Sequence, residues 1–488
     1  MIAHTKSGRA QKRNISINLT KEERTHRYHN ITNVVRDSLC TNCGICYSVC
    51  PSHAIVIDKT IDGVFVPEID NMKCNNCGLC GDVCPGHSID FDNLNTAFFG
   101  KHPDSALLGN FLNCYVGHAT EERMRIESSS GGLVTALLIF ALENKLIDGA
   151  LVVRMQKTTP LMPEVVIART REDILSSQGS KYCPVPVDIG LRQIMRDGGK
   201  YAVVGLPCHI EGIRKAEMKD PEMRTKIVLH LGIFCSHSVS FSGTETLLNE
   251  EGIDTNQVES LRYRGSGWPG GMTVNLNNGQ SKFIPLSLYW GKYLNRSLYI
   301  PNRCFFCSDG LAELSDISFG DAWILRECRS DTLGSSVAIS RTEVGERFLH
   351  EALTAGRIQI HKIDSMQIVT SQRRVLHFKK KNLKARFLAA KLIGKRTPHY
   401  NDQNMRRLKP SILAYLLAFI PFLEKYALSN KILAPLFKRI PPVIVKVYRH
   451  LLSYVLRVEF SIGVRKIRKI HSVFQVKMEE GNGKNTRD

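Results

Sequence analysis

Apolar runs of two lengths alternate along the middle of the chain. Residues 133–143 form one long apolar segment, which predicts a buried helix, and residues 149–153 follow as a short run typical of a strand. Further short apolar runs occupy residues 201–206 and 227–234, with helical segments between them. Strands that alternate with helices in this way predict an α/β sheet.

The C-terminal quarter has a different pattern. Apolar blocks are interrupted there by Pro410, Pro421, Pro435 and Pro441-Pro442. The longest uncharged apolar run, residues 412–423, is shorter than the roughly 18 to 20 residues of a membrane-spanning helix. The N-terminus lacks an apolar stretch that could serve as a secretion signal. We therefore expect a cytoplasmic protein with reduced thiols, either free in solution or peripheral at the inner face of the membrane.

Composition and charge narrow the class of protein further. The chain has 488 residues, of which 43% are hydrophobic and 23% charged, enough for about three domains with cores of their own. The net charge of +20 is concentrated at the C-terminus, where residues 371–488 contain 27 Lys/Arg against 6 Asp/Glu. Residues 37–370 carry a charge of −7, so the body offers no clustered cations for phosphates, and we expect no nucleic-acid partner.

Eight of the 15 cysteines form two copies of one motif. Both copies have the spacing C-x2-C-x2-C-x3-C-P, which places three thiolates on one loop and gives the fourth to the other copy's cluster. The alternative is zinc, which also binds C-x2-C pairs but has no reason to use this arrangement twice. The first 4Fe-4S cluster is assigned to Cys40, Cys43, Cys46 and Cys84, and the second to Cys74, Cys77, Cys80 and Cys50. Residues 33–95 thus resemble a bacterial-type two-cluster ferredoxin module.

Four further cysteines are candidates for a third cluster. Cys208 and Cys235 each follow a likely buried strand, so they could share one edge of the sheet. Cys304 and Cys307 form another C-x2-C pair and would complete a set of four thiolates. The alternative is that such cysteines are small buried hydrophobes without a ligand.

The helix predicted at 133–143 is preceded by Ser-Ser-Ser-Gly-Gly, a run of small residues. Free amides and the positive end of a helix dipole at such a start favour a phosphate group. The alternative is a serine cap followed by glycines that allow close packing. The segment Gly265-Ser-Gly-Trp-Pro-Gly270 matches the pattern G-x-G-x-x-G of dinucleotide-binding turns. We do not interpret it as such a turn, because a proline interrupts it and no helix follows.

Seven motifs in series resemble one known family. They are Ser128-Ser-Ser-Gly-Gly-Leu-Val-Thr-Ala-Leu, Gly179-Ser-Lys-Tyr, Val204-Gly-Leu-Pro-Cys-His-Ile-Glu-Gly-Ile-Arg-Lys, Gly232-Ile-Phe-Cys, Tyr263-Arg-Gly-Ser-Gly-Trp-Pro-Gly-Gly-Met, Arg303-Cys-Phe-Phe-Cys and Asp316-Ile-Ser-Phe-Gly-Asp-Ala-Trp. This series resembles the beta subunits of coenzyme F420 hydrogenases and dehydrogenases. The resemblance implies an FAD-binding iron–sulfur domain, and it supports a third 4Fe-4S cluster at Cys208, Cys235, Cys304 and Cys307.

The resemblance also implies FAD contacts and catalytic candidates. Lys181 is a candidate cation at the electron-rich edge of the flavin, or else a solvated loop lysine. Asp321 is a candidate to orient a flavin or ribose hydroxyl, or else it caps a turn. The expected FAD-binding residues are Ser129, Ser130, Gly131, Gly132, Thr135, Gly179, Ser180, Lys181, Tyr182 and Asp321.

The expected fold has four parts. It is an α+β ferredoxin-like two-cluster module followed by an α/β flavin-binding iron–sulfur domain, with a mainly helical basic C-terminal tail. The expected boundaries are 1–32 for a basic N-terminal tail, 33–95 for the ferredoxin domain, 110–372 for the FAD and iron–sulfur domain, and 373–488 for the basic tail.

Basic side chains in that tail recur at helical intervals, opposite a broad apolar surface. They are Lys446, Arg449, His450, Ser453 and Arg457, with Ser453 as the polar member of the face. This pattern predicts a basic amphipathic helix that lies on an anionic membrane, or that packs on a partner subunit or on the α/β body.

The leading hypothesis is an iron–sulfur flavoprotein oxidoreductase. It would transfer electrons between a hydride carrier or organic substrate at FAD and 4Fe-4S clusters or ferredoxin, with coenzyme F420 as one candidate carrier. One alternative is a non-catalytic electron-transfer subunit that docks to a separate reductase. Another is a ferredoxin-dependent reductase of a lipid-borne or sugar intermediate. The expected partners are an electron-transfer protein or the hydride carrier.

Overall fold

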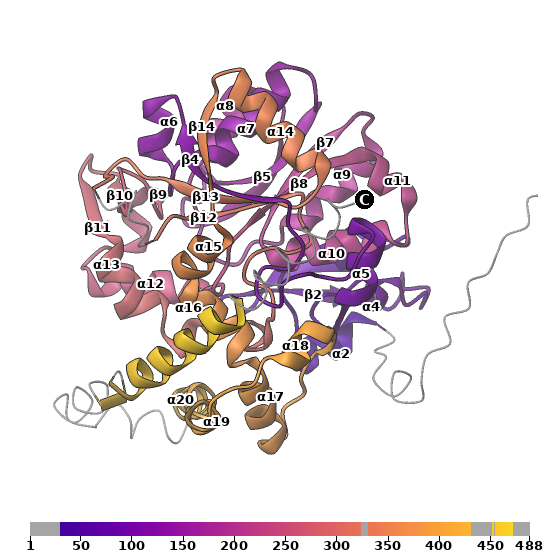
Figure 1. The fold of residues 1–488 in the computed structure, drawn as a ribbon, viewed down its shortest axis with the longest axis vertical. Coiled ribbons are helices and arrows are strands. Elements are labelled where there is room, and N and C mark those ends of the chain that lie inside the picture. The colour runs from indigo at the N-terminus through magenta and orange to yellow at the C-terminus, as the bar shows by residue number, and fades with distance from the viewer. Residues whose placement is uncertain (1–29, 324–329, 431–450, 453, 472–488) are drawn as a thin grey trace, which may run out of the picture.

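A mixed eight-stranded sheet forms the centre of the protein (Figure 1), in a computed structural model that describes residues 30–323, 330–430, 451–452 and 454–471. The strand order is β14-β4-β13-β12-β8-β7-β5-β6. The four neighbours β12, β8, β7 and β5 are parallel, and antiparallel strands flank them on both sides. The strands are β4 (Asn113–Ala119), β5 (Gly149–Met155), β6 (Pro163–Ala168), β7 (Tyr201–Gly205), β8 (Ile227–Ile233), β12 (Ile317–Asp321), β13 (Ser336–Ser340) and β14 (Ile358–Ile363).

Helices cover both faces of this sheet. Alternate residues of a strand point to opposite faces, and here they enter two separate cores: Ala202 packs with α7, α8 and α14, whereas Val203 packs with α9, α10 and α11. The sequence prediction of an α/β sheet is confirmed. The first layer consists of α7 (Leu133–Glu143), α8 (Arg171–Ser176) and α14 (Glu343–Thr354), with α6 (Glu122–Glu127) nearby, and the second of α9 (Leu191–Arg196), α10 (Pro207–Glu217) and α11 (Pro221–Lys226).

The ferredoxin-like module lies against the second helix layer. It contains a hairpin, in which β1 pairs antiparallel with β2. Its apolar residues Ile45, Val83 and Phe91 join the core formed by α9, α10 and α11, so the module and the body share packing. The elements are α2 (Ile31–Arg36), α3 (Ile45–Val49), β1 (Ile55–Lys59), β2 (Phe65–Ile69), α4 (Leu79–Asp82), β3 (Ser88–Asp90) and α5 (Phe91–Phe99).

A small three-stranded antiparallel sheet, in the order β11-β10-β9, packs beside the large one. Its second strand includes the alternating residues Met272 to Leu276, so the segment after Gly270 is a strand and not the helix of a dinucleotide fold. The elements are α12 (Phe241–Glu250), β9 (Val258–Arg262), β10 (Gly271–Leu276), β11 (Ser281–Pro285) and α13 (Leu286–Tyr289).

The chain after β14 returns to the ferredoxin-like module and covers it. Strand β15 pairs in parallel with β3, with His399 opposite Ser88, and α17 packs on the loop that carries Cys304 and Cys307. Within the described residues, no helix is long and apolar enough to cross a membrane. The elements are α15 (Ser365–Ser371), α16 (Arg373–Leu376), the π-helix η7 (His377–Lys381), α17 (Leu383–Leu392), β15 (His399–Asn401), α18 (Gln403–Arg407), α19 (Ile412–Leu417) and α20 (Ile420–Ser429).

Candidate functional site

The two cysteine motifs of the ferredoxin-like module fold into similar loops. Asn42 and Gly44 in the first loop have φ of 61° and 91°, and Asn76 and Gly78 in the second have 55° and 76°. These left-handed positions follow the first and second cysteines and turn backbone amides inward. In the first loop, the Asn42 amide donates to the Cys40 sulfur at 3.4 Å. Inward amides of this kind are what a bound cluster needs around its sulfurs.

The cysteines approach one another as the motif predicts, with the fourth exchanged between loops. Burial raises the pKa of the Cys46 thiol well above its ordinary value, and negative charge on Cys43, Cys40 and Cys84 raises it further. Cys80 likewise lies close to Cys77 of its own loop and to Cys50 of the other. Sets of thiols crowded in this manner fit iron–sulfur clusters, whose iron ions neutralise the thiolates.

The two sets differ in their access to solvent. Cys43, Cys46 and Cys84 of the first set are buried. In the second set Cys77 is exposed, and Cys46 and Cys80 lie near each other across the gap between the sets. The first set therefore lies in the interior and the second reaches the surface.

Neighbouring parallel strands bring Cys208 and Cys235 together, as the sequence predicted. Gly205 at the end of β7 is in register with Gly232 near the end of β8, so the residues that follow lie at the same edge of the sheet. Cys208 lies close to Cys235 and Cys307, and Cys235 lies close to Cys304. All four thiols line one cavity, and Cys208 also lies close to Cys43 of the first set.

No group of three or more His, Cys, Asp or Glu among the described residues is close enough to hold a single metal ion. A tetrahedral zinc site holds each sulfur about 2.3 Å from one ion, so its sulfurs almost touch. A cubane carries its four thiolates on four separate irons and keeps them further apart. The doubled C-x2-C-x2-C-x3-C-P spacing is the observation that favours the cubane over zinc here.

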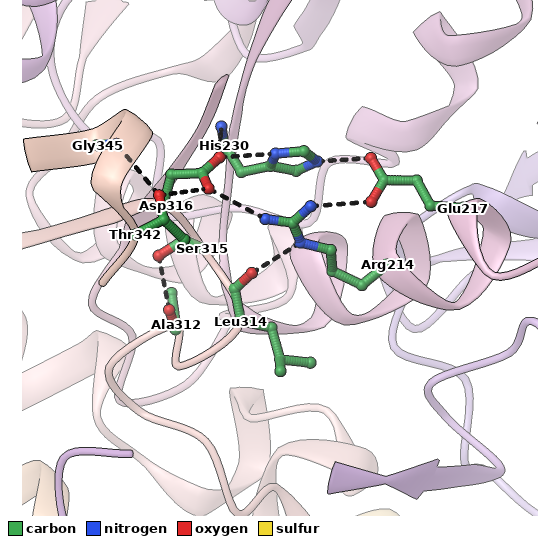
Figure 2. Close-up of polar contacts among 9 residues, drawn as sticks. All are labelled: Arg214, Glu217, His230, Ala312, Leu314, Ser315, Asp316, Thr342 and Gly345. Atoms are coloured by element: carbon green, nitrogen blue, oxygen red, sulfur yellow. Dashed lines mark hydrogen bonds and ion pairs between the residues drawn. The ribbon is translucent and has the colours of Figure 1, made fainter. Parts of the chain in front are cut away.

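A buried network of charges fixes the helix that carries Cys208 against the strand that leads to Cys235 (Figure 2). The His230 ring on β8 bonds to Glu217 on α10 at 2.8 Å and to Asp316 at 2.9 Å. Arg214 on α10 bonds to the same two carboxylates at 2.9 and 3.4 Å. Since the pKa of His230 is raised by these carboxylates while that of Asp316 is lowered, the network holds two cations and two anions.

One cavity of about 890 Å³ connects the third cysteine set with the predicted flavin-binding residues. Its wall also includes Cys40, Thr41 and Asn42 of the first ferredoxin loop. Every predicted flavin contact except Gly131 lines this cavity. The lining set is Ser129, Ser130, Gly132, Thr135, Gly179, Ser180, Lys181, Tyr182 and Asp321.

The start of α7 faces the cavity with an uncapped end. Its N-cap is Gly132, with φ of 79° and no side chain to bond the first-turn amides. Gly131 donates its amide to the Ser336 hydroxyl, and a Cβ on Gly131 would lie 2.5 Å from the Gly117 carbonyl oxygen. A helix of 11 residues with free first-turn amides, aimed at a large cavity, fits the phosphate groups of a dinucleotide.

Lys181 lies in the loop after α8, between two cavities. Its buried amine donates to the carbonyl oxygens of Ser177 at 2.5 Å, Gln178 at 3.2 Å and Gly179 at 2.9 Å, so it is not the solvated lysine of the alternative interpretation. Burial lowers the pKa of this amine to about 7. A second cavity of about 640 Å³ shares Gln178, Ser180 and Lys181 with the first.

Asp321 ends β12 and is held by two partners that its own motif does not contain. Arg264 clamps its carboxylate with bonds of 2.6 and 2.9 Å, and the Trp268 indole donates to it at 2.8 Å. The carboxylate therefore organises the cavity wall through Arg264, which also contacts the Tyr182 hydroxyl at 3.3 Å. Arg264 and Trp268 stand in a motif recognised from the sequence, yet only the fold shows that they meet Asp321.

Sequence reasoning missed Lys379 at the third cysteine set. Composition places the run Lys379-Lys380-Lys381 in the basic tail, but all three side chains are buried. Lys379 lies close to Cys307, and Lys380 pairs with Glu313 at 2.5 Å. No local signal marks them, because a run of lysines is ordinarily a solvated surface.

The predicted tail helix is described only in part. Lys446, Arg449, His450 and Ser453 lie outside the described residues, whereas Arg457 belongs to a helix that continues to residue 471. Val464 and Ile467 of that helix are buried, and Glu459 pairs with His377 at 3.0 Å. One side of the helix therefore packs on the body.

Comparison with known proteins agrees with this geometry. The model for the C terminus of the beta subunit of coenzyme F420 hydrogenase/dehydrogenase matches residues 198–366, and the model for the N-terminal region of the same subunit matches 114–191. The chain belongs to the coenzyme F420 hydrogenase/dehydrogenase beta-subunit family. A 4Fe-4S dicluster domain also matches residues 39–87. The family predicted from the serial motifs is confirmed, and the chain is an electron-transfer protein of the iron–sulfur oxidoreductase type.

Three curated relatives of this family show how far the similarity extends. The beta subunit of coenzyme F420 hydrogenase from Methanothermobacter thermautotrophicus is 28% identical over 60% of this chain and all of the relative. The coenzyme F420-dependent sulfite reductase of Methanocaldococcus jannaschii is 28% identical over 72% of this chain and 51% of the relative. An uncharacterised protein of the same organism is 30% identical over 57% of this chain and 72% of the relative.

Proposed function

We propose that the chain is an iron–sulfur flavoprotein that exchanges electrons between a hydride carrier or organic substrate and its own 4Fe-4S clusters. The observation that carries this proposal is the single cavity that joins the uncapped start of α7 to the third cysteine set and to the first ferredoxin loop. FAD bound there would supply the conversion between two-electron and one-electron transfer, because a flavin exchanges one or two electrons and a cubane only one.

The residues of the chain have distinct tasks in this proposal. Ser129, Ser130 and the first turn of α7 would hold the phosphates of FAD, and the Arg264–Asp321 pair would fix the shape of the opposite wall. Cys208, Cys235, Cys304 and Cys307 would hold a third cubane between that cavity and the ferredoxin-like module. Apolar side chains such as Val204 and Phe319 line the cavity, which suits transfer of a hydride.

The relatives support coenzyme F420 as a carrier to test, since two of them are named for it. Fold and family do not by themselves fix the substrate. We therefore propose a parallel turnover test with reduced deazaflavin coenzyme, NADPH and reduced ferredoxin.

An anaerobic inventory of cofactors tests the core of the proposal. We expect three cubanes and one FAD per chain from iron, sulfide and flavin analysis together with EPR spectra. Iron and sulfide without flavin would support the non-catalytic electron-transfer subunit instead. Flavin that is present but inert toward all three donors would contradict the enzymatic proposal.

We also propose that the tail docks on an anionic membrane. Apolar side chains on α19 and α20 are exposed, including Ile412 at 85%, Leu416 at 68% and Tyr426 at 63%. Both helices lie with α17 at one end of the molecule (Figure 1), and Lys391, Lys395 and Arg396 at the end of α17 are exposed. At roughly 1 kcal/mol for each cation near anionic lipid, these three side chains would contribute about 3 kcal/mol to binding.

Co-sedimentation with vesicles tests this docking. We expect the protein to bind vesicles that contain phosphatidylglycerol, to be released by salt, and to ignore vesicles of phosphatidylcholine alone. Changing Ile412 and Leu416 together to Glu should weaken the binding, whereas Met72→Glu, at another exposed apolar residue, should not. Equal sedimentation of the two variants would contradict the proposal.

A further inference from the structure

In the part of the chain that the structure describes, four cations lie near the third cysteine set, and three of them come from residues that follow the family match. Arg303 belongs to the body, whereas Lys379, Arg386 and the half-buried Lys425 lie beyond residue 366. Arg386 donates to the Phe305 carbonyl at 2.6 Å, and Lys425 donates to the Ile300 carbonyl at 2.7 Å. Both carbonyls belong to the segment that carries Cys304 and Cys307, so the C-terminal region holds this loop in place.

Lys379 is the cation that reaches the sulfur atoms themselves. Its side chain is 2% exposed, lines the cavity together with the four cysteines, and lies close to Cys307, Cys235 and Cys304. A Cβ added to Gly310 would lie 2.3 Å from Val375 Cγ1 and 3.3 Å from Lys379 Cγ, so this glycine allows the segment that carries Lys379 to pack closely. Its neighbour Lys380 pairs with a carboxylate, whereas the ammonium group of Lys379 is directed at thiols.

Few negative charges oppose this cation at the cysteines. Glu211 is buried near Cys208 and Lys379. Asp309 is another buried carboxylate near this set, and its two oxygens accept the amides of Leu311 and Glu313. The thiols therefore face more positive charge than negative.

We propose that Lys379 is a positioning residue that sets the reduction potential of the third cluster. The inference rests on the proposed function, because it requires a cluster at these cysteines. A cubane gains one electron and becomes more negative on reduction, while the ammonium charge does not change and no proton moves. A fixed positive charge at the sulfurs stabilises the reduced form, because net charge and hydrogen bonds to the sulfurs govern cluster potentials. The third cluster should therefore have a higher midpoint potential with Lys379 than without it.

An anaerobic redox titration of the holoprotein, followed by EPR, tests this inference. Lys379→Met and Lys379→Gln should each shift one of three midpoint potentials to a more negative value and leave the other two in place. Lys379→Arg keeps the charge and should retain a potential near that of the wild type. Lys409→Met removes an exposed lysine of the same C-terminal region and should shift none.

The outcomes separate a failure of the inference from a failure of the proposed function. A wild-type protein with only two clusters would overturn the third cluster itself. Three clusters with unchanged potentials in Lys379→Gln would overturn the role of Lys379, since glutamine keeps a donor and removes the charge. If Lys379→Met loses the cluster, the comparison of Lys379→Gln with Lys379→Arg still tests whether charge sets the potential. Both variants retain a hydrogen-bond donor, and only the arginine retains the charge.

Discussion

The buried network of Figure 2 allows a quantitative test of what holds the third cysteine set together. In His230→Gln, a neutral amide replaces the ring and its one nitrogen cannot bond to both Glu217 and Asp316, so the two hydrogen bonds between charged groups are lost. Such bonds contribute about 1.5 to 3 kcal/mol each. Because Arg214 still bonds to both carboxylates, we expect the lower end, a loss of about 3 kcal/mol. For a cooperative unit the size of this body, that corresponds to a fall in Tm of about 6 to 12 °C.

Thermal unfolding of the cluster-loaded protein under anaerobic conditions, followed by circular dichroism, measures this loss. The matched control is His350→Gln, since His350 also bonds to a carboxylate, Glu346 at 3.1 Å, but its side chain is 58% exposed. Exposed pairs contribute about 1 kcal/mol or less, so the control should lose at most a few degrees. An equal fall in Tm for the two variants would refute the structural role of the network.

The same network predicts how stability changes with pH. The pKa of His230 is raised above its ordinary 6.5, so its stabilising contribution is complete below pH 6.5 and is lost as the pH rises through the raised value. The pKa of Asp316 is lowered below 3.8, so its contribution is present above pH 3.8 and is lost only in stronger acid. The gap in Tm between wild type and His230→Gln should therefore be wide at pH 6 and narrow as the pH is raised toward 10. A gap that is constant across this range would contradict a charged His230.

Three further predictions concern the cofactors. Cys235→Ser should remove about a third of the iron, because it takes one ligand from one of three cubanes, whereas the buried but unassigned Cys183 should tolerate serine with full iron content. Gly131→Ala should lose most of the flavin released on denaturation, because the new Cβ would lie 2.5 Å from a carbonyl oxygen, whereas Gly198→Ala meets nothing within 4 Å and should keep it. Asp321→Asn should break the buried ion pair with Arg264, which costs about 3 to 5 kcal/mol of the free energy of unfolding. Both Tm and flavin content should therefore fall. Flavin analysis that shows no difference between the two glycine variants would contradict the placement of FAD.

The parts of the site that the sequence predicted depend on short-range rules. The spacing of the eight ferredoxin cysteines determines their exchange between loops, and the structure brings Cys46 near Cys84 and Cys50 near Cys80 as expected. Cys208 and Cys235 could be placed together because residues just after neighbouring parallel strands meet at one edge of a sheet. The assignment of all twelve cysteines to three clusters stays a prediction that cofactor analysis must test.

What the sequence could not predict depends on packing between distant segments. Ser336 meets the start of α7 only because β13 lies next to β4 and β12 in the sheet. Arg264 and Asp321 come from separate motifs whose meeting requires the small sheet to close over the large one. Lys379 is buried because α16 and η7 turn its segment back toward the cysteines, a path that composition alone does not reveal.

The pairing of β15 with β3 fixes how the ferredoxin-like module behaves during electron exchange. The module is bound on one side by the body, where Arg303 donates to the carbonyls of Pro85 and Gly86, and on the other by a strand from beyond residue 395. A domain that is held on two sides cannot rotate between one position in which it accepts electrons and another in which it donates them. Intramolecular electron transfer should therefore proceed at the same rate in dilute buffer and in viscous glycerol, and only the encounter with an external partner should slow.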